Sequence, residues 1–159
     1  MSNQEQKKIK PKIEEIAPEY LEGDKLKNVL DFVAWLRAGR MTPTFGSRSS
    51  EGISYTTRVC YIKLYKDSWY IWPAGKKGAY VNDFLACEEL KEIVGTSLAP
   101  CKPCGHQCNS GLGFVKTVCG KEFEKICGCC PIRFHNPGAE TLNIIKKVIE
   151  NRNKIKYRE

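Results

Sequence analysis

The chain has 159 residues, nine of which are cysteine, and a formal net charge of +8 at pH 7. A hydrophobic fraction of 42% is sufficient for one domain with its own core. The apolar stretches are short and interrupted by charge, and the polar N-terminus has no apolar signal segment, so we expect a cytoplasmic protein with no membrane partner.

The positive charge is concentrated at the two ends of the chain, with +3 in residues 1–12 and +4 in residues 146–159. Solvated tails and helix ends often carry such charge, whereas a nucleic-acid interface usually needs cations gathered on one folded face. We therefore favour a small binding or adaptor module, with a protein or a small ligand as its partner. A nucleic-acid-binding protein that uses its basic C-terminal helix is the less favoured alternative.

The composition also predicts the domain organisation. Residues 1–15 are rich in lysine and poor in apolar side chains, which predicts a flexible basic segment ahead of a single domain over residues 16–159. Within that domain, the cysteine-rich residues 100–131 are expected to form a subdomain inserted before the last strand and helix.

The first predicted elements are a helix and a loop. Apolar residues recur at helical spacing after Asp24, which is a suitable N-cap, and the pattern ends at Gly39. The next stretch, MTPTFGSRSSEG (residues 41–52), contains proline, glycine and serine, and predicts a loop.

The following residues predict an antiparallel hairpin. The stretch YTTRVCYIKLYKDSWYIWP (residues 55–73) is rich in β-branched and aromatic residues and has a turn signal at residues 66–68. Period-two alternation places Trp69 and Trp72 on opposite faces, with Tyr70 on the same face as Trp72. Core packing is the preferred interpretation for any one of these rings. As candidate ligand-binding residues, Trp69, Tyr70 and Trp72 would line a pocket or stack on nucleobases.

Three further elements are expected after the hairpin. Asn82 is a candidate cap for a second helix, PIRF (residues 131–134) predicts a short strand, and Asn136 with Pro137 suits the start of the last helix. The apolar sides of the two helices would consist of Phe84, Leu85, Leu90 and Val94, and of Leu142, Ile145, Val148 and Ile149. Together the elements predict an α+β fold, with an antiparallel sheet packed against N- and C-terminal helices.

The most specific signal is a pair of C-x-x-C motifs, CKPC and CGCC, within a segment that holds seven cysteines. Disulfides are not expected in the reducing cytoplasm, and the cysteine count is odd. Thiolate pairs at this spacing suit a tetrahedral Zn²⁺ site, and the residues between them have strand–turn–strand character. We predict a structural, zinc-ribbon-like site with the ligands Cys101, Cys104, Cys127 and Cys130.

Several alternatives to this ligand set stay open. An iron–sulfur cluster also accepts four cysteines and would make the chain an iron- or cluster-handling protein; redox thiols and packing cysteines are further alternatives. Cys60 and Cys87 are expected in the core, Cys87 within a helix. Possible substitutes for one of the four ligands are Cys108, Cys119, Cys129, His106 and His135.

An enzymatic function is not favoured. The two histidines, His106 and His135, flank the cysteine segment, but neither has a visible third group or oxyanion site that a cysteine–histidine hydrolase would need.

Two segments of the chain resemble the YdhG-like family of small bacterial α+β domains. These are SYTTRVCYIKLYKDSWYIWP (residues 54–73) and PIRFHNPGAETLNIIKKVIENR (residues 131–152). It implies an open antiparallel sheet packed on helices from both chain ends, with the cysteine segment as an insertion. The family includes frataxin-like iron chaperones. Iron delivery does not carry over, because such chaperones bind hard iron on an acidic surface whereas this chain is basic.

Overall fold

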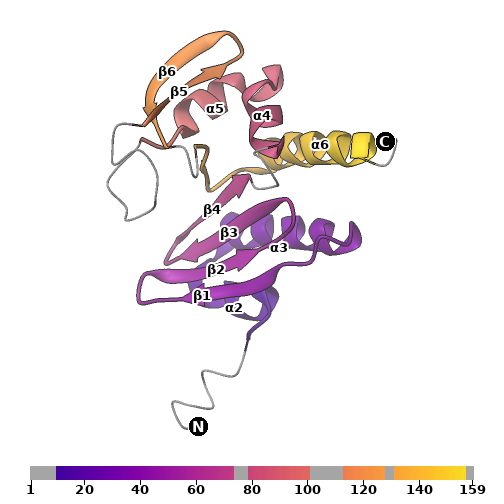
Figure 1. Cartoon of the computed structure of the whole chain (residues 1–159). Helices are drawn as coiled ribbons and strands as arrows, with labels where there is room; N and C mark the ends of the chain where they lie inside the picture. Colours follow the sequence, from indigo (N-terminus) through magenta and orange to yellow (C-terminus); the bar gives the residue numbers. More distant parts are fainter. Residues whose placement is uncertain (1–9, 74–78, 101–112, 128–130, 157–159) are drawn as a thin grey trace.

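The computed structural model describes residues 10–73, 79–100, 113–127 and 131–156 (Figure 1). Its fold is α+β, as the sequence predicts. In chain order the elements are α2 (Ile13–Tyr20), α3 (Gly23–Ala38), β1 (Thr44–Arg48), β2 (Gly52–Thr56), β3 (Cys60–Tyr65), β4 (Ser68–Pro73), α4 (Ala79–Leu85), η2 (Glu88–Leu90), α5 (Lys91–Ser97), β5 (Phe114–Val118), β6 (Lys121–Ile126), β7 (Phe134–His135) and α6 (Ala139–Lys156).

Five of the strands form one sheet in the order β1-β2-β3-β4-β7, and every neighbouring pair is antiparallel. The predicted hairpin is confirmed as β3–β4, with Tyr65 opposite Ser68 across the turn. The loop predicted over residues 41–52 is wrong, because β1 pairs with β2 and has a bulge between Phe45 and Ser47. The strands β5 and β6 form a separate two-stranded hairpin.

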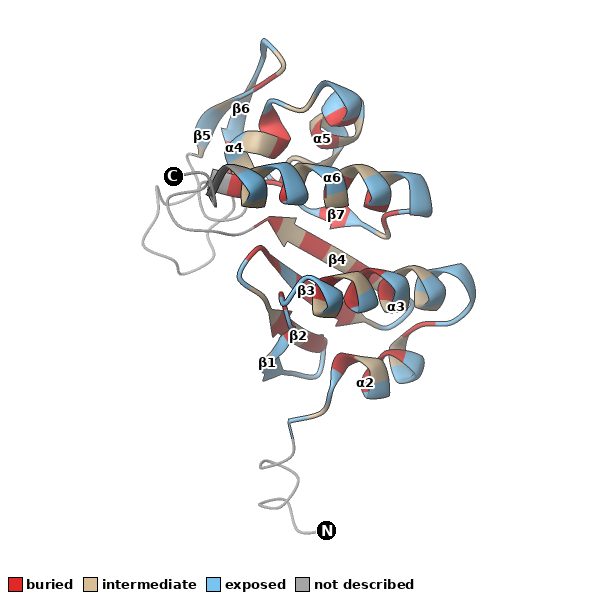
Figure 2. Cartoon of the chain, turned by 90° about the vertical axis from the view of Figure 1, so that its right-hand side faces the viewer, coloured by how far each residue is buried: buried red, intermediate tan, exposed pale blue. Residues whose placement is uncertain are grey.

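One face of the sheet is covered by helices. In Figure 1, α2 and α3 lie behind the sheet, and Figure 2 shows the buried side of α3 turned towards it. Trp69 of β4 is fully buried and its ring lies 6.4 Å from that of Phe32 on α3. Cys60 is also part of this core, as predicted, and burial raises the pKa of its thiol to about 12. Further core side chains from the strands and from α6 are Ile53, Ile62, Leu64, Ile71, Phe134, Leu142, Ile145 and Ile149.

The N-terminal helix is part of the packed structure from its first residue. Ile13 is buried, and Glu14 forms an ion pair with Arg37 of α3. The hydrogen bond from Arg37 lowers the pKa of the Glu14 carboxyl. The ordered helix therefore begins before the predicted boundary at residue 15, whereas residues 1–9 lie outside the described chain.

The helix expected from Asn82 onwards is divided into three short elements. Asn82 lies inside α4 and does not cap it, and Cys87 lies in the connection between α4 and η2, where it is half-buried against the core. The apolar side is nevertheless as predicted, since Phe84, Leu85, Leu90 and Val94 are all buried. Helical apolar spacing identified the buried residues correctly but did not reveal the break.

Asn136 has a different role from the predicted helix cap. The helix α6 begins at Ala139, while Asn136 has a positive φ of 44° directly after β7. Its backbone N–H donates to the Trp69 carbonyl at 2.9 Å, and its side-chain Oδ1 accepts from the Trp69 N–H at 2.9 Å. Asparagine tolerates this backbone conformation and supplies the acceptor, so it continues the pairing of β4 where the short strand β7 ends.

Replacing Asn136 with alanine should destabilise the fold by about 1–3 kcal/mol, because the Trp69 N–H loses its acceptor. The matched variant Asn136→Asp keeps an oxygen acceptor and tolerates the same backbone conformation, so it should stay close to the wild type. Urea unfolding of the three proteins measures the difference. Equal stability of Asn136→Ala and the wild type would show that the side-chain bond to the Trp69 N–H does not hold this edge.

Candidate functional site

The structure describes one of the four predicted zinc ligands. Cys127 lies directly after β6 and is 6% exposed, whereas Cys101, Cys104 and Cys130 lie outside the described residues. The substitutes Cys108, Cys129 and His106 also lie outside them. Within the described ranges, no group of three or more metal-binding side chains is present.

Described residues in and next to the CGCC motif form backbone hydrogen bonds with one short segment, residues 97–100. The Ala99 carbonyl accepts from the Cys127 N–H at 2.8 Å, and the Ala99 N–H donates to the Pro131 carbonyl at 2.9 Å. Pro100 forms an antiparallel bridge with Ile126. Residues 97–100 therefore hold residues on both sides of the CGCC motif.

This pairing continues towards β7. Leu98 forms an antiparallel bridge with Ile132, and the Arg133 N–H donates to the Ser97 carbonyl at 2.9 Å. The segment of residues 97–100 thus directly precedes Cys101 and pairs with the residues that precede Cys127 and follow Cys130, although the two C-x-x-C motifs are far apart in the sequence.

The substitute Cys119 lies far from Cys127. It occupies the turn between β5 and β6, and the six residues of β6 place Cys127 roughly 15 Å or more away at the other end of the hairpin. One zinc ion cannot take both sulfurs, because each ligand sulfur lies only about 2.3 Å from the metal. Burial and the nearby Glu88 carboxylate raise the pKa of the Cys119 thiol, which favours its protonated form.

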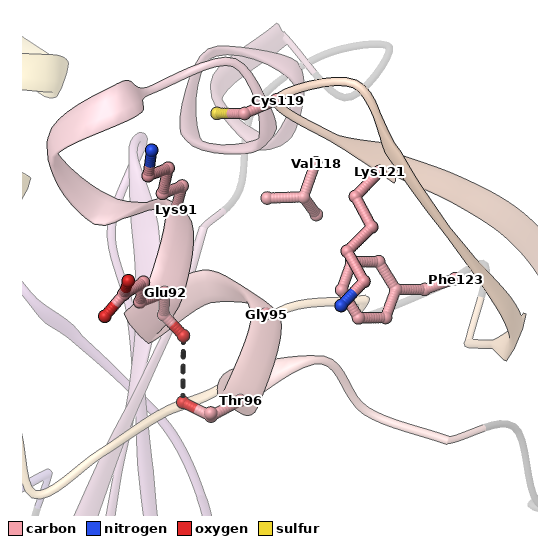
Figure 3. Close-up of a pocket in the computed structure, with 8 residues that line it drawn as sticks. All are labelled: Lys91, Glu92, Gly95, Thr96, Val118, Cys119, Lys121 and Phe123. Carbon is pink, nitrogen blue, oxygen red and sulfur yellow. Dashed lines mark hydrogen bonds between the residues drawn. The ribbon is translucent and has the colours of Figure 1, made fainter.

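A groove of about 510 Å³ lies between α5 and the β5–β6 hairpin (Figure 3). Figure 3 shows Phe123 of β6 facing α5 at Gly95, and a side chain added at Gly95 would meet the Phe123 ring at 3.5 Å. The ammonium of Lys121 lies 5.3 Å from the centre of the same ring. The groove is lined by Lys91, Glu92, Gly95, Thr96, Val118, Cys119, Lys121 and Phe123. These contacts attach the hairpin to the body of the protein.

The second candidate site is the face of the five-stranded sheet that lies opposite the core, which we call the open face. Its strand registers form three rows of side chains across the sheet, and every strand contributes to at least one row. The rows are Thr44, Thr56, Tyr61 and Trp72; Ser47, Ser54, Lys63, Tyr70 and His135; and Tyr65 with Ser68.

The aromatic side chains of the open face gather on β3, β4 and β7. The ring of Tyr70 lies 4.6 Å from that of His135 and 6.0 Å from that of Trp72, with planes within 20° in both pairs. Tyr65 meets Tyr70 edge-on at 5.4 Å. Tyr61, opposite Trp72, is 47% exposed. Three nearly parallel rings and two flanking tyrosines therefore form a continuous aromatic surface.

Two cations border these rings. The ammonium of Lys63 lies 4.8 Å from the centre of the Tyr65 ring, and the guanidinium of Arg133 lies 5.6 Å from that of Trp72. The strand positions of the open face carry no carboxylate within the described residues. The local charge is thus positive, although the sequence places most of the net charge at the chain ends.

The three ring residues predicted to bind a ligand divide between the two faces. Trp69 belongs to the core, whereas Tyr70 and Trp72 are half-buried on the open face. The Nε1 atom of Trp72 is buried and has no hydrogen-bond partner among the described residues. The sequence does not identify His135 as a partner of Tyr70, because their contact depends on the pairing of β4 with β7.

The basic C-terminal helix is partly engaged within the protein. Arg152 donates two hydrogen bonds of 2.5 Å to Asp83 of α4, and the Lys146 ammonium lies 6.0 Å from the Trp35 ring on α3. These contacts hold α6 against its neighbours, so its charge is less available to a partner than the sequence suggests. No helix in the described part of the chain has the length and apolar character needed to cross a membrane.

Comparisons of the chain with models of protein families, with curated proteins and with solved structures gave no match. The resemblance to the YdhG-like family therefore stays a prediction from the sequence, and the function has to be inferred from the cysteine-bearing segments and the open face.

Proposed function

We propose that this protein is a zinc-stabilised binding module. Its Zn²⁺ would be held by the thiolates of Cys101, Cys104, Cys127 and Cys130, beside the segment of residues 97–100. The supporting observation is the pairing around Ala99, which binds the backbone on both sides of the CGCC motif. Pro100, which is covalently joined to Cys101, is bridged to Ile126, so the described residues that precede the two cysteine pairs are neighbours.

The metal in this proposal is structural. A two-stranded hairpin is marginally stable by itself, and β5–β6 exposes Phe114 and Val115 to solvent. Its contacts with α5 lie around Phe123, while Ile126 and Cys127 lie at its other end. A zinc site there would reinforce the end of the hairpin that is otherwise held by the pairing of Ile126 and Cys127 with Pro100 and Ala99, and its binding energy would contribute to folding.

The binding surface in this proposal is the open face. The core is complete on the opposite side of the sheet, so the exposed Tyr61 and the half-buried Tyr70 and Trp72 are not needed to close it. Aromatic rings with bordering cations are typical of binding surfaces, because they combine contact area with little loss of conformational entropy.

Elemental analysis of freshly purified, tag-free protein tests the metal proposal. We expect close to one zinc ion per chain and no visible absorption, because zinc with four thiolates has no redox or colour signature. Iron accompanied by charge-transfer bands would replace the proposal with the iron–sulfur or iron-handling alternative. Protein prepared anaerobically without any bound metal would overturn both.

A further inference from the structure

The open face has two chemically different halves. The side chains from β1 and β2 are short hydroxyl groups, and those of Ser47 and Ser54 lie 2.8 Å apart. The side chains from β3, β4 and β7 are mostly aromatic. Aliphatic residues of these strands, such as Ile62 and Ile71, point into the core instead. The face therefore offers ring surfaces next to small hydrogen-bonding groups.

Its electrostatics favour an anionic partner. Lys63 lies in the middle row between Ser54 and Tyr70, and Arg133 lies over Trp72 at the β7 edge. Lys63 thus lies within the aromatic half and Arg133 beside it, and the described strand positions of the open face carry no carboxylate. A polymer with regularly spaced phosphates gains from such contacts along its backbone, and binding also releases its counterions.

The rings further restrict the class of anion. Tyr70, Trp72 and His135 have nearly parallel planes and are stacked on one another, so a flat group can pack on the ring surfaces that this stack leaves uncovered. Unpaired bases provide such flat surfaces, whereas the bases of a duplex are already stacked and paired inside the helix. A sheet surface with stacking aromatic residues is a recurrent way to bind single strands.

We propose that the open face binds single-stranded nucleic acid, with bases against Trp72, Tyr70 and Tyr61 and phosphates at Lys63 and Arg133. This proposal rests on the binding face assigned above, but not on the identity of the metal. The sequence-based alternative combined the hairpin aromatics with the basic C-terminal helix, whereas here the cations are Lys63 and Arg133, beside the rings themselves.

Fluorescence anisotropy tests the proposal with the freshly purified full chain and labelled oligothymidylate and oligouridylate of about 12 nucleotides, within the usual site sizes. At low salt, Trp72→Ala should weaken binding about tenfold, through loss of a stacking contact. Lys63→Gln should weaken it a few-fold and reduce the dependence on salt by about one counterion. A duplex of the same length should bind more weakly than either single strand.

The matched control is Lys147→Gln, which removes the same charge from an exposed position on α6. It should leave the affinity unchanged. An equal loss for Lys147→Gln and Lys63→Gln, or equal affinity for duplex and single strand, would overturn the proposal, since both would indicate non-specific attraction. A concentration-dependent dimer of the wild type that is lost in Trp72→Ala would also overturn the proposal, because the open face would then bind a second copy of the chain.

Metal content and circular dichroism of the same preparation separate the two proposals. A folded, zinc-containing protein that binds neither oligonucleotide at low salt overturns the nucleic-acid proposal and leaves the zinc proposal intact. A folded protein without zinc that still binds single strands overturns the zinc proposal and leaves the nucleic-acid proposal intact. If Trp72→Ala does not fold, Tyr61→Ala replaces it, because Tyr61 is 47% exposed and its loss leaves the core unchanged.

Discussion

Cys127→Ser is expected to lose the bound zinc and to unfold at a clearly lower temperature than the wild type. A metal that binds only the folded state adds about 4 kcal/mol to its stability when its free concentration exceeds Kd a thousandfold. Cys127 is buried directly after β6, where its backbone N–H is bonded to the Ala99 carbonyl, so serine at this position removes the proposed thiolate ligand without removing that bond. Thermal unfolding followed by circular dichroism, together with metal analysis, measures both effects.

Cys119→Ser is the matched control for this experiment. It makes the same chemical change in the same hairpin, but at the turn far from Cys127. Zinc content and melting temperature should remain close to those of the wild type. A Cys127→Ser protein with a full complement of zinc would remove Cys127 from the ligand set, and loss of zinc from Cys119→Ser would contradict the separation along the hairpin.

Trp69→Ala should destabilise the protein by about 3–5 kcal/mol, the usual effect of removing a large buried aromatic side chain. Trp69 is fully buried and packs near Phe32 of α3, so its removal leaves a cavity between the sheet and the helix. Trp72→Ala, three residues later on the open face, should cost only about 1 kcal/mol, because its ring is partly exposed.

Urea unfolding of these two variants tests which face of β4 belongs to the core. The midpoint for Trp69→Ala should fall far below that of the wild type, and the midpoint for Trp72→Ala should stay near it. The reverse order would mean that the sheet packs on its helices through the other face, and it would also remove the basis for the open face as a binding surface.

Alternation along β4 predicts from sequence that Trp69 and Trp72 lie on opposite faces, but not which of them is buried. That choice depends on which side of the sheet α2 and α3 cover, and both faces of β4 carry large rings. The same limit applies to Tyr70 and His135. Their ring contact arises from the pairing of β4 with β7, which are far apart in the sequence.

The sequence patterns did not predict several parts of the fold that depend on backbone hydrogen bonds between strands. The strand β1 has the sequence TFGSR, which carries no apolar alternation, and it exists because its backbone pairs with β2. Asn136 matched the pattern of a helix cap, but its hydrogen bonds go to Trp69 on another strand. The C-x-x-C spacing is visible in the sequence. The backbone pairing of residues 97–100 with the residues on both sides of the CGCC motif has no such local sequence pattern.

The position of β7 in the sheet has a consequence for the order of folding. The strands β1 to β4 are consecutive in the chain and need only short turns to pair, whereas β4 meets β7 only after the long excursion from Pro73 to Phe134. Closing that excursion carries an entropic cost that short turns avoid. We therefore expect the meander to form early, with the edge of β4 unpaired until β7 arrives. An ion that joined the two cysteine motifs would shorten this search, and would limit the time in which an exposed strand edge can pair with another molecule.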